Sequence, residues 1–127
     1  MGKGQLAKFY FEQGCNCSQA VVLAFKEEIG LSEDVLKKLS IGLGGGVARQ
    51  RLVCGAVSGM TMVLSYMLSD GNDKLAIYKI VQDACEEFKR EVGSLICAEL
   101  LDGVASKDTS PIPSERTKEY YKKRPCA

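Results

Sequence analysis

The sequence of 127 residues contains no histidine. Histidine is the side chain whose ordinary pKa lies closest to neutral pH, so this chain has no imidazole to act as a general base there. Serine–histidine and cysteine–histidine catalysis are therefore excluded, as are histidine-ligated zinc and histidine-ligated haem. The chemistry that remains is chiefly that of sulfur.

The chain also lacks a surplus of charge of either sign. Its 17 basic residues nearly balance its 16 acidic residues, which leaves no electrostatic footprint for nucleic acid. The short run Lys122-Lys123-Arg124 is interpreted as a solvated helix end, because basic patches usually need longer runs.

Export and membrane signals are missing as well. The N-terminus has neither a continuous apolar stretch nor a small-residue cleavage site, so we expect a cytoplasmic protein. The uncharged stretch from Leu52 to Ser69 just reaches the length of a membrane span. It contains several small polar residues and is flanked directly by Arg51 and Asp70, so we interpret it as the buried central helix of a soluble bundle.

Cysteine is the residue that the chain has in quantity. The six positions are Cys15, Cys17, Cys54, Cys85, Cys97 and Cys126. Thiols normally stay reduced in the cytoplasm, so six of them favour metal or redox roles over a structural disulfide framework.

Apolar residues recur at helical spacing through most of the chain. Asn16, with Gln19 three residues later, predicts a capping box at the start of a second helix. We expect one all-α domain over residues 1–127, a compact bundle of five to seven helices around a central apolar helix. The expected helices cover 4–12, 16–30, 32–39, 52–70, 73–91, 94–101 and 114–123. Residues 104–127 form a loop and a tail that carries Cys126, with 114–123 as its one short helix.

Three thiols fall at predicted helix N-termini: Cys17, Cys54 and Cys97. Unpaired backbone N–H groups and the helix dipole stabilise negative charge at such positions. We therefore expect lowered thiol pKa values there, with Arg49 and Arg51 adding to the effect at Cys54.

The other two cysteines of the helical region have simpler interpretations. Cys85 lies on an apolar helical stripe and is expected to fill the core as a small hydrophobe. Cys15 lies in a loop and is either spare or a resolving thiol.

Glycine is concentrated on both sides of Cys54 in the sequence. Gly42-Leu-Gly-Gly-Gly46 fits no phosphate-binding motif, so a flexible linker is the simpler interpretation and a backbone nest the alternative. Gly55 and Gly59 share one helix face, which would let another helix or a bound cofactor approach the backbone beside Cys54.

Four blocks of sequence occur together in a recognisable order. They are Gly14-Cys-Asn-Cys17-Ser-Gln-Ala20, Cys54-Gly-Ala-Val-Ser-Gly59, Cys97-Ala-Glu-Leu100 and the terminal Cys126, with Gly44-Gly-Gly-Val-Ala-Arg49 between the first two. The chain thereby resembles the redox-active family named for its C–GCAxxG–C–C pattern. The resemblance implies that Cys17, Cys54, Cys97 and Cys126 are the functional thiols, and it leaves Cys15 and Cys85 outside the pattern.

Three functions are consistent with these residues. The first is thiol redox work, in which two or more of the four signature cysteines cycle between dithiol and disulfide or pass electrons to an unknown redox partner. The second is a zinc or iron–sulfur site with the same four cysteines as ligands, although no two of them share a C-x₂-C spacing. The third is a non-catalytic helical interaction protein. An apolar central helix is also compatible with a homodimer.

Overall fold

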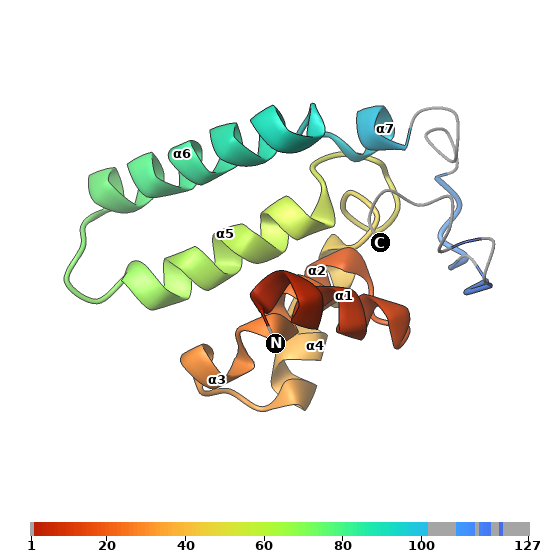
Figure 1. Ribbon diagram of the computed structural model, residues 1–127, viewed down its shortest axis with the longest axis horizontal. Coiled ribbons are helices and arrows are strands. Elements are labelled where there is room, and N and C mark those ends of the chain that lie inside the picture. Colours follow the sequence, from red (N-terminus) through yellow and green to blue (C-terminus); the bar gives the residue numbers. More distant parts are fainter. Residues whose placement is uncertain (1, 102–108, 114, 118–119, 121–127) are drawn as a thin grey trace.

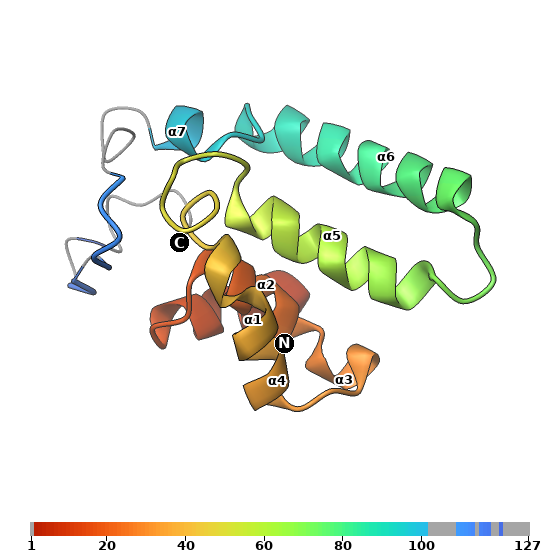
Figure 2. The ribbon, with the colours of Figure 1, turned by 180° about the vertical axis from the view of Figure 1, so that it is seen from behind.

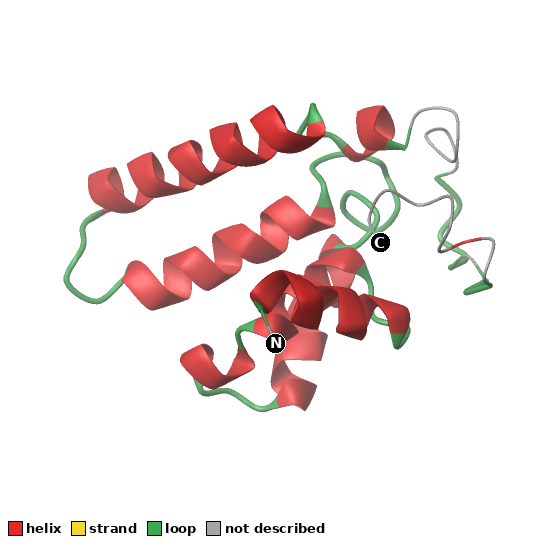
Figure 3. Ribbon diagram, in the orientation of Figure 1, coloured by secondary structure: helices red, strands yellow, loops and turns green. Residues whose placement is uncertain are grey.

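The computed structural model describes residues 2–101, 109–113, 115–117 and 120. Within these ranges the chain forms seven α-helices and one 3₁₀ turn, and no strand (Figures 1 and 3). The elements are α1 Lys3–Glu12, α2 Cys17–Ala24, α3 Lys26–Ile29, α4 Glu33–Ser40, η1 Ile41–Leu43, α5 Gly55–Leu68, α6 Lys74–Val92 and α7 Cys97–Leu100. The predicted all-α class is confirmed.

Helices α5 and α6 form a long antiparallel hairpin, and the short helices α1 to α4 gather on the side of α5 that faces away from α6 (Figures 1 and 2). Helix α2 packs against α1, α4 and α5. It therefore joins the hairpin to the group of short helices.

Helix α2 contributes most to the buried core. Leu23 and Val22 are almost completely buried, and Phe11 of α1, Leu36 of α4 and Val63 of α5 pack around them. The buried residues of α5 are Gly55, Val57, Gly59 and Val63, whereas its last turn exposes Tyr66 and Met67. No helix in the described ranges has the length and apolar character needed to cross a membrane.

Three predicted boundaries were wrong. The helix expected over 94–101 begins only at Cys97. The helix expected over 16–30 is divided at Phe25, whose N–H bonds to the carbonyl of Val22 rather than Val21 and so tightens the last turn of α2. The central helix begins at Gly55 rather than near residue 52, because residues 51–54 pair instead with residues 95–98.

Helix α6 has the predicted amphipathic pattern. The residues of its apolar face are all half-buried: Ile77, Val81, Ala84, Cys85 and Phe88. The charged residues of the opposite face are exposed: Lys79, Asp83, Glu86, Glu87 and Arg90. Cys85 is only half-buried and is not one of the buried core residues, so the prediction that it fills the core was wrong.

The predicted last helix over 114–123 lies largely outside the described residues. Residues 115–117, which are described, are not helical.

The capping box at the start of α2 is confirmed. The side chain of Asn16 accepts a hydrogen bond from Gln19 N at 2.9 Å, and the Gln19 side chain accepts one from Asn16 N at 3.0 Å. Asn16 Nδ2 also donates to the carbonyl of Ile41 at 2.9 Å, which links the start of α2 to the 3₁₀ turn. This residue therefore fixes both a helix end and a tertiary contact.

Replacement of Asn16 by Ala should lower the free energy of unfolding by about 2 kcal/mol, because one cap bond and the bond to Ile41 are both lost. The matched control is Asp73→Ala, which removes a single exposed cap bond to Ala76 N and should cost about 1 kcal/mol. Urea denaturation measures both. Equal losses would show that the bond to Ile41 adds no stability.

Candidate functional site

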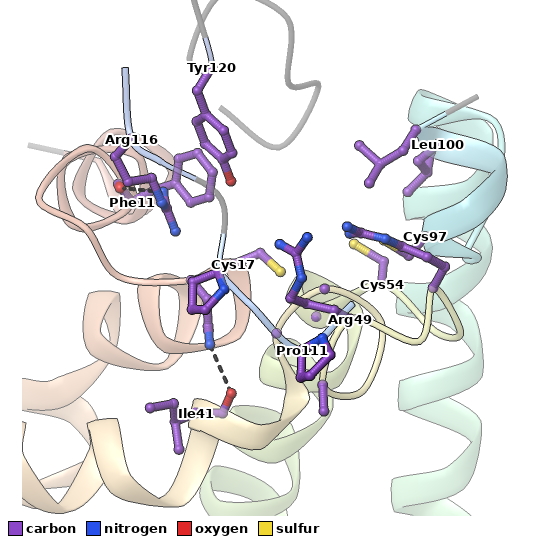
Figure 4. Close-up of a pocket in the computed structure, with 18 residues that line it drawn as sticks. Phe11, Cys17, Ile41, Arg49, Cys54, Cys97, Leu100, Pro111, Arg116 and Tyr120 are labelled. Atoms are coloured by element: carbon purple, nitrogen blue, oxygen red, sulfur yellow. Dashed lines mark hydrogen bonds between the residues drawn. The ribbon is translucent and has the colours of Figure 1, made fainter. Parts of the chain in front are cut away.

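Three of the four signature thiols meet at one pocket of about 310 Å³ (Figure 4). Cys17 is the first residue of α2, Cys54 is the N-cap of α5, and Cys97 is the first residue of α7. Their predicted positions at helix N-termini are confirmed, although the N-cap of α7 is Ile96 rather than Ser94. Cys126 lies outside the described residues.

An isolated antiparallel bridge brings Cys54 and Cys97 together. Val53 pairs with Ile96, Cys54 N donates to the carbonyl of Leu95 at 2.8 Å, and Cys97 N donates to that of Leu52 at 2.6 Å. Side chains alternate across an extended segment. Cys54 and Cys97 therefore lie on one side of the bridge as diagonal neighbours, while Val53 and Ile96 face the other side and are partly exposed.

A glycine brings Cys17 close to Cys54. A Cβ atom on Gly55 would lie 2.4 Å from the sulfur of Cys17 and 2.9 Å from the carbonyl oxygen of Leu43. Only a residue without a side chain leaves room for the Cys17 sulfur at this position. The sulfur consequently packs against the backbone of the residue that follows Cys54.

Gly59 has a similar role one turn further along α5. Its missing Cβ would lie 3.0 Å from the carbonyl oxygen of Ser18 and 3.2 Å from Val21 Cβ. Both glycines face α2, so they allow two helices to pack closely. A direct role for either in binding a cofactor stays a prediction.

The glycine-rich segment is not a plain linker. Gly45 and Gly46 adopt positive φ angles, and so do Val47 at 62°, Ala48 at 50° and Arg49 at 66°. Each such residue other than glycine costs about 1–2 kcal/mol, because its Cβ crowds the following carbonyl oxygen. Hydrogen bonds from Ala48 N to the carbonyl of Gly42 and from Leu52 N to that of Gly46 close the segment into a left-handed turn over 45–49.

The left-handed turn places two arginines beside the thiols. Arg51, also at positive φ (64°), is only 5% exposed, and its Nη1 donates to the sulfur of Cys97 at 3.7 Å. Arg49 donates through Nε to the carbonyl of Ser110 at 2.7 Å, and its side chain extends between Cys17 and Cys54 in Figure 4. The strained backbone thus holds positive charge at the pocket.

A third arginine comes from the C-terminal region. Arg116 donates to the carbonyls of Phe11 and Cys15, at 3.2 Å and 3.1 Å, and its guanidinium lies beside the stacked rings of Phe11 and Tyr120 (Figure 4). Pro111 and Pro113 also line the pocket. Arg116 could not be predicted as a site residue, because nothing local to residue 116 indicates partners about a hundred residues earlier in the chain.

The thiol of Cys54 does not have the lowered pKa expected from its position. Burial raises its pKa above the ordinary range, and the neighbouring Cys17 raises it further. The N–H groups of Ala56 and Val57 bond to the sulfur and lower the pKa, whereas Cys97 raises it slightly. Desolvation of the thiolate therefore outweighs the helix N-terminus here.

Cys15 and Cys85 lie apart from this site. Cys15 is buried in the hydrophobic core with Tyr10 and Phe11, which accounts for its raised pKa. Burial also raises the pKa of Cys85, with a smaller contribution from Glu86. Neither residue lines the pocket.

The residues described do not include a compact metal site. Within residues 2–101 and the described C-terminal segments, no three cysteine or carboxylate side chains are grouped closely enough to hold one metal ion. Cys17, Cys54 and Cys97 are therefore not arranged so that these three sulfurs alone could bind one metal ion.

Replacement of Gly55 by Ala should displace the Cys17 sulfur and lower the free energy of unfolding by roughly 1–3 kcal/mol, as overpacking usually does. The control is Gly4→Ala on α1, where an added Cβ meets nothing within 4 Å, and which should be neutral or stabilising. Urea denaturation of both variants gives the comparison. A Gly55→Ala variant as stable as wild type would show that the close approach of α2 is not needed.

Alkylation of Cys54 should require a higher pH than alkylation of a free cysteine, because burial disfavours its thiolate. Iodoacetamide pulses at a series of pH values are followed by mass spectrometry, in a Cys15→Ala/Cys85→Ala background. The pH at which Cys54 labelling reaches half its maximum should be higher in the folded protein than in the urea-unfolded chain. A native midpoint below the unfolded one would contradict burial as the dominant effect.

A family model described as "Putative redox-active protein (C_GCAxxG_C_C)" matches residues 15–127, which include every residue of the three-thiol pocket except Phe11. No match is found among curated proteins or among solved structures. Because the matched region covers most of the sequence, the chain belongs to the C_GCAxxG_C_C family.

Proposed function

We propose that this protein is a thiol–disulfide redox protein in which Cys17 and Cys54 form the reactive pair. The observation that carries the proposal is the contact of the Cys17 sulfur with the backbone of Gly55, directly beside Cys54. The influence of Cys17 on the pKa of Cys54 is larger than that of Cys97, which supports the same pairing. Membership of a family described as redox-active agrees with this chemistry.

The two thiols differ in a way that suits separate roles. Cys17 is half-buried at the start of the eight-residue helix α2, whereas Cys54 is only 8% exposed. The more accessible thiol is the better placed to attack an incoming disulfide, and the buried thiol then resolves the mixed disulfide. When the protein disulfide is reduced again, the N–H groups of Ala56 and Val57 stabilise the departing Cys54 thiolate.

The arginines make the pocket around the thiol pair positively charged. Arg49 and Arg51 line it together with Cys17 and Cys54, although neither arginine is among the groups that shift the pKa of Cys54. Arg51 bonds to Cys97, which keeps the third thiol beside the pair without placing it against Gly55. We expect the cycle to operate in the cytoplasm with a redox partner that accepts or supplies two electrons.

The test is the identity of the disulfide formed under controlled oxidation. Anaerobically purified protein equilibrated with reduced and oxidised glutathione should lose about 2 Da, for two protons and two electrons released. Proteolytic mapping should join Cys17 to Cys54. Cys17→Ser and Cys54→Ser should abolish this bond, while the matched control Cys85→Ser should retain it.

A bond between Cys54 and Cys97, or between two protein molecules only, would contradict the proposal. Absence of any disulfide, even with the strong thiol oxidant diamide, would reject dithiol chemistry for this pair altogether.

A further inference from the structure

A second cavity, of about 590 Å³, lies on another side of the two reactive thiols. It is formed by α1, the first half of α2, the start of α5, the end of α6 and α7. Cys17 and Cys54 line this groove as well as the arginine-containing pocket, whereas Cys97 lines only that pocket. The thiol pair therefore forms part of the wall that the two cavities share.

The groove is shaped by residues with little or no side chain. Small residues open one part of it: Gly4, Ala7, Ala20, Ala56 and Gly93. Larger apolar residues supply the remaining surface: Phe11, Val21, Phe88, Val92 and Leu100. A cavity of this volume with mostly apolar walls is typical of a site for a small hydrophobic molecule.

The two cavities differ in charge. Among the described residues that line the groove, the charged ones are Lys8 and Glu99, one of each sign. Lys8 lies 4.0 Å from Glu12, and Glu99 accepts a hydrogen bond from Ser94. The described lining of the other pocket contains Arg49, Arg51 and Arg116 and no acidic residue. The described lining of the groove thus carries no net charge, whereas that of the other pocket is positive.

We propose that this groove binds an uncharged, hydrophobic disulfide and presents it to Cys17. The inference rests on the proposed function, because it assigns a substrate class to the same thiol pair. An uncharged ligand fits because moving a charge from water into an apolar groove is unfavourable. A disulfide fits because the groove ends at two thiols that can exchange with it.

The reaction balances without another reactant. The Cys17 thiolate attacks one sulfur of the ligand, the ligand S–S bond breaks, and one ligand thiolate leaves and takes up a proton. The Cys54 thiolate then attacks the Cys17 sulfur of the mixed disulfide and releases the second ligand thiolate. The protein is oxidised by two electrons and the ligand disulfide is reduced to two thiols.

The experiment compares two aromatic disulfides that differ chiefly in charge. Dithiodipyridine is uncharged at neutral pH, and dithiobis(nitrobenzoate) carries two carboxylates; both release coloured thiols. Rates are measured by stopped-flow absorbance with a Cys15→Ala/Cys85→Ala/Cys97→Ala/Cys126→Ala variant, and each is divided by the rate for the same variant unfolded in urea. We expect the normalised rate to be roughly tenfold higher for the uncharged reagent.

Two variants locate the effect in the groove. Ala7→Trp, at a half-buried position of α1, and Val92→Trp, at a 49% exposed position of α6, should each fill the groove. Each should reduce the normalised rate for dithiodipyridine by about fivefold or more, as expected when a ligand site is blocked. The normalised rate for dithiobis(nitrobenzoate) should stay unchanged in both variants. The matched control is Ala76→Trp on α6, outside both cavities, which should change neither rate.

Each contrary outcome has a separate meaning. Equal normalised rates, a preference for the dianionic reagent, or no effect of the two groove variants when they are folded by circular dichroism would overturn the groove as the substrate site. Failure of both reagents to join Cys17 to Cys54 would instead overturn the proposed function, so the two failures are distinguishable.

Discussion

The close packing of α2 on the N-terminal half of α5 is the contact on which the site depends. Gly55 and Gly59 present bare backbone to the first turns of α2, at Cys17, Ser18 and Val21. The same helix α2 forms the middle of the core, so the contact that completes the hydrophobic interior also sets the distance between two thiols. Stability and thiol geometry therefore arise from one helix–helix interface.

Electrostatics at the site reflect a competition between burial and donated hydrogen bonds. A helix N-terminus favours a thiolate, yet Cys54 lies too deep for that effect to prevail, and its pKa is raised. Arginine side chains from a strained loop bring positive charge into the same small volume. A buried thiol with a raised pKa attacks slowly until a reaction intermediate brings its target close, which suits a residue that acts second.

Much of the fold could be predicted from the sequence because its signals are local. The periodicity of residues 73–91 and the pair Asn16 and Gln19 specify helices through contacts within a few positions. The signature thiols could be singled out, but their meeting could not be worked out from local patterns. It depends on the pairing of Val53 with Ile96, a bridge of one residue pair that leaves no alternating pattern in the sequence.

The left-handed turn over 45–49 makes the positions of two charged side chains, Arg49 and Arg51, depend on the conformation of one short backbone segment. Its backbone is unfavourable for Val47, Ala48 and Arg49, so it persists only while its hydrogen bonds to Gly42, Gly44 and neighbouring carbonyls hold. Local opening of this segment would release backbone strain and at the same time withdraw Arg49 and Arg51 from the pocket. The charge that these two arginines supply is in this sense a property of backbone conformation, and both would be lost in a single cooperative step rather than one side chain at a time.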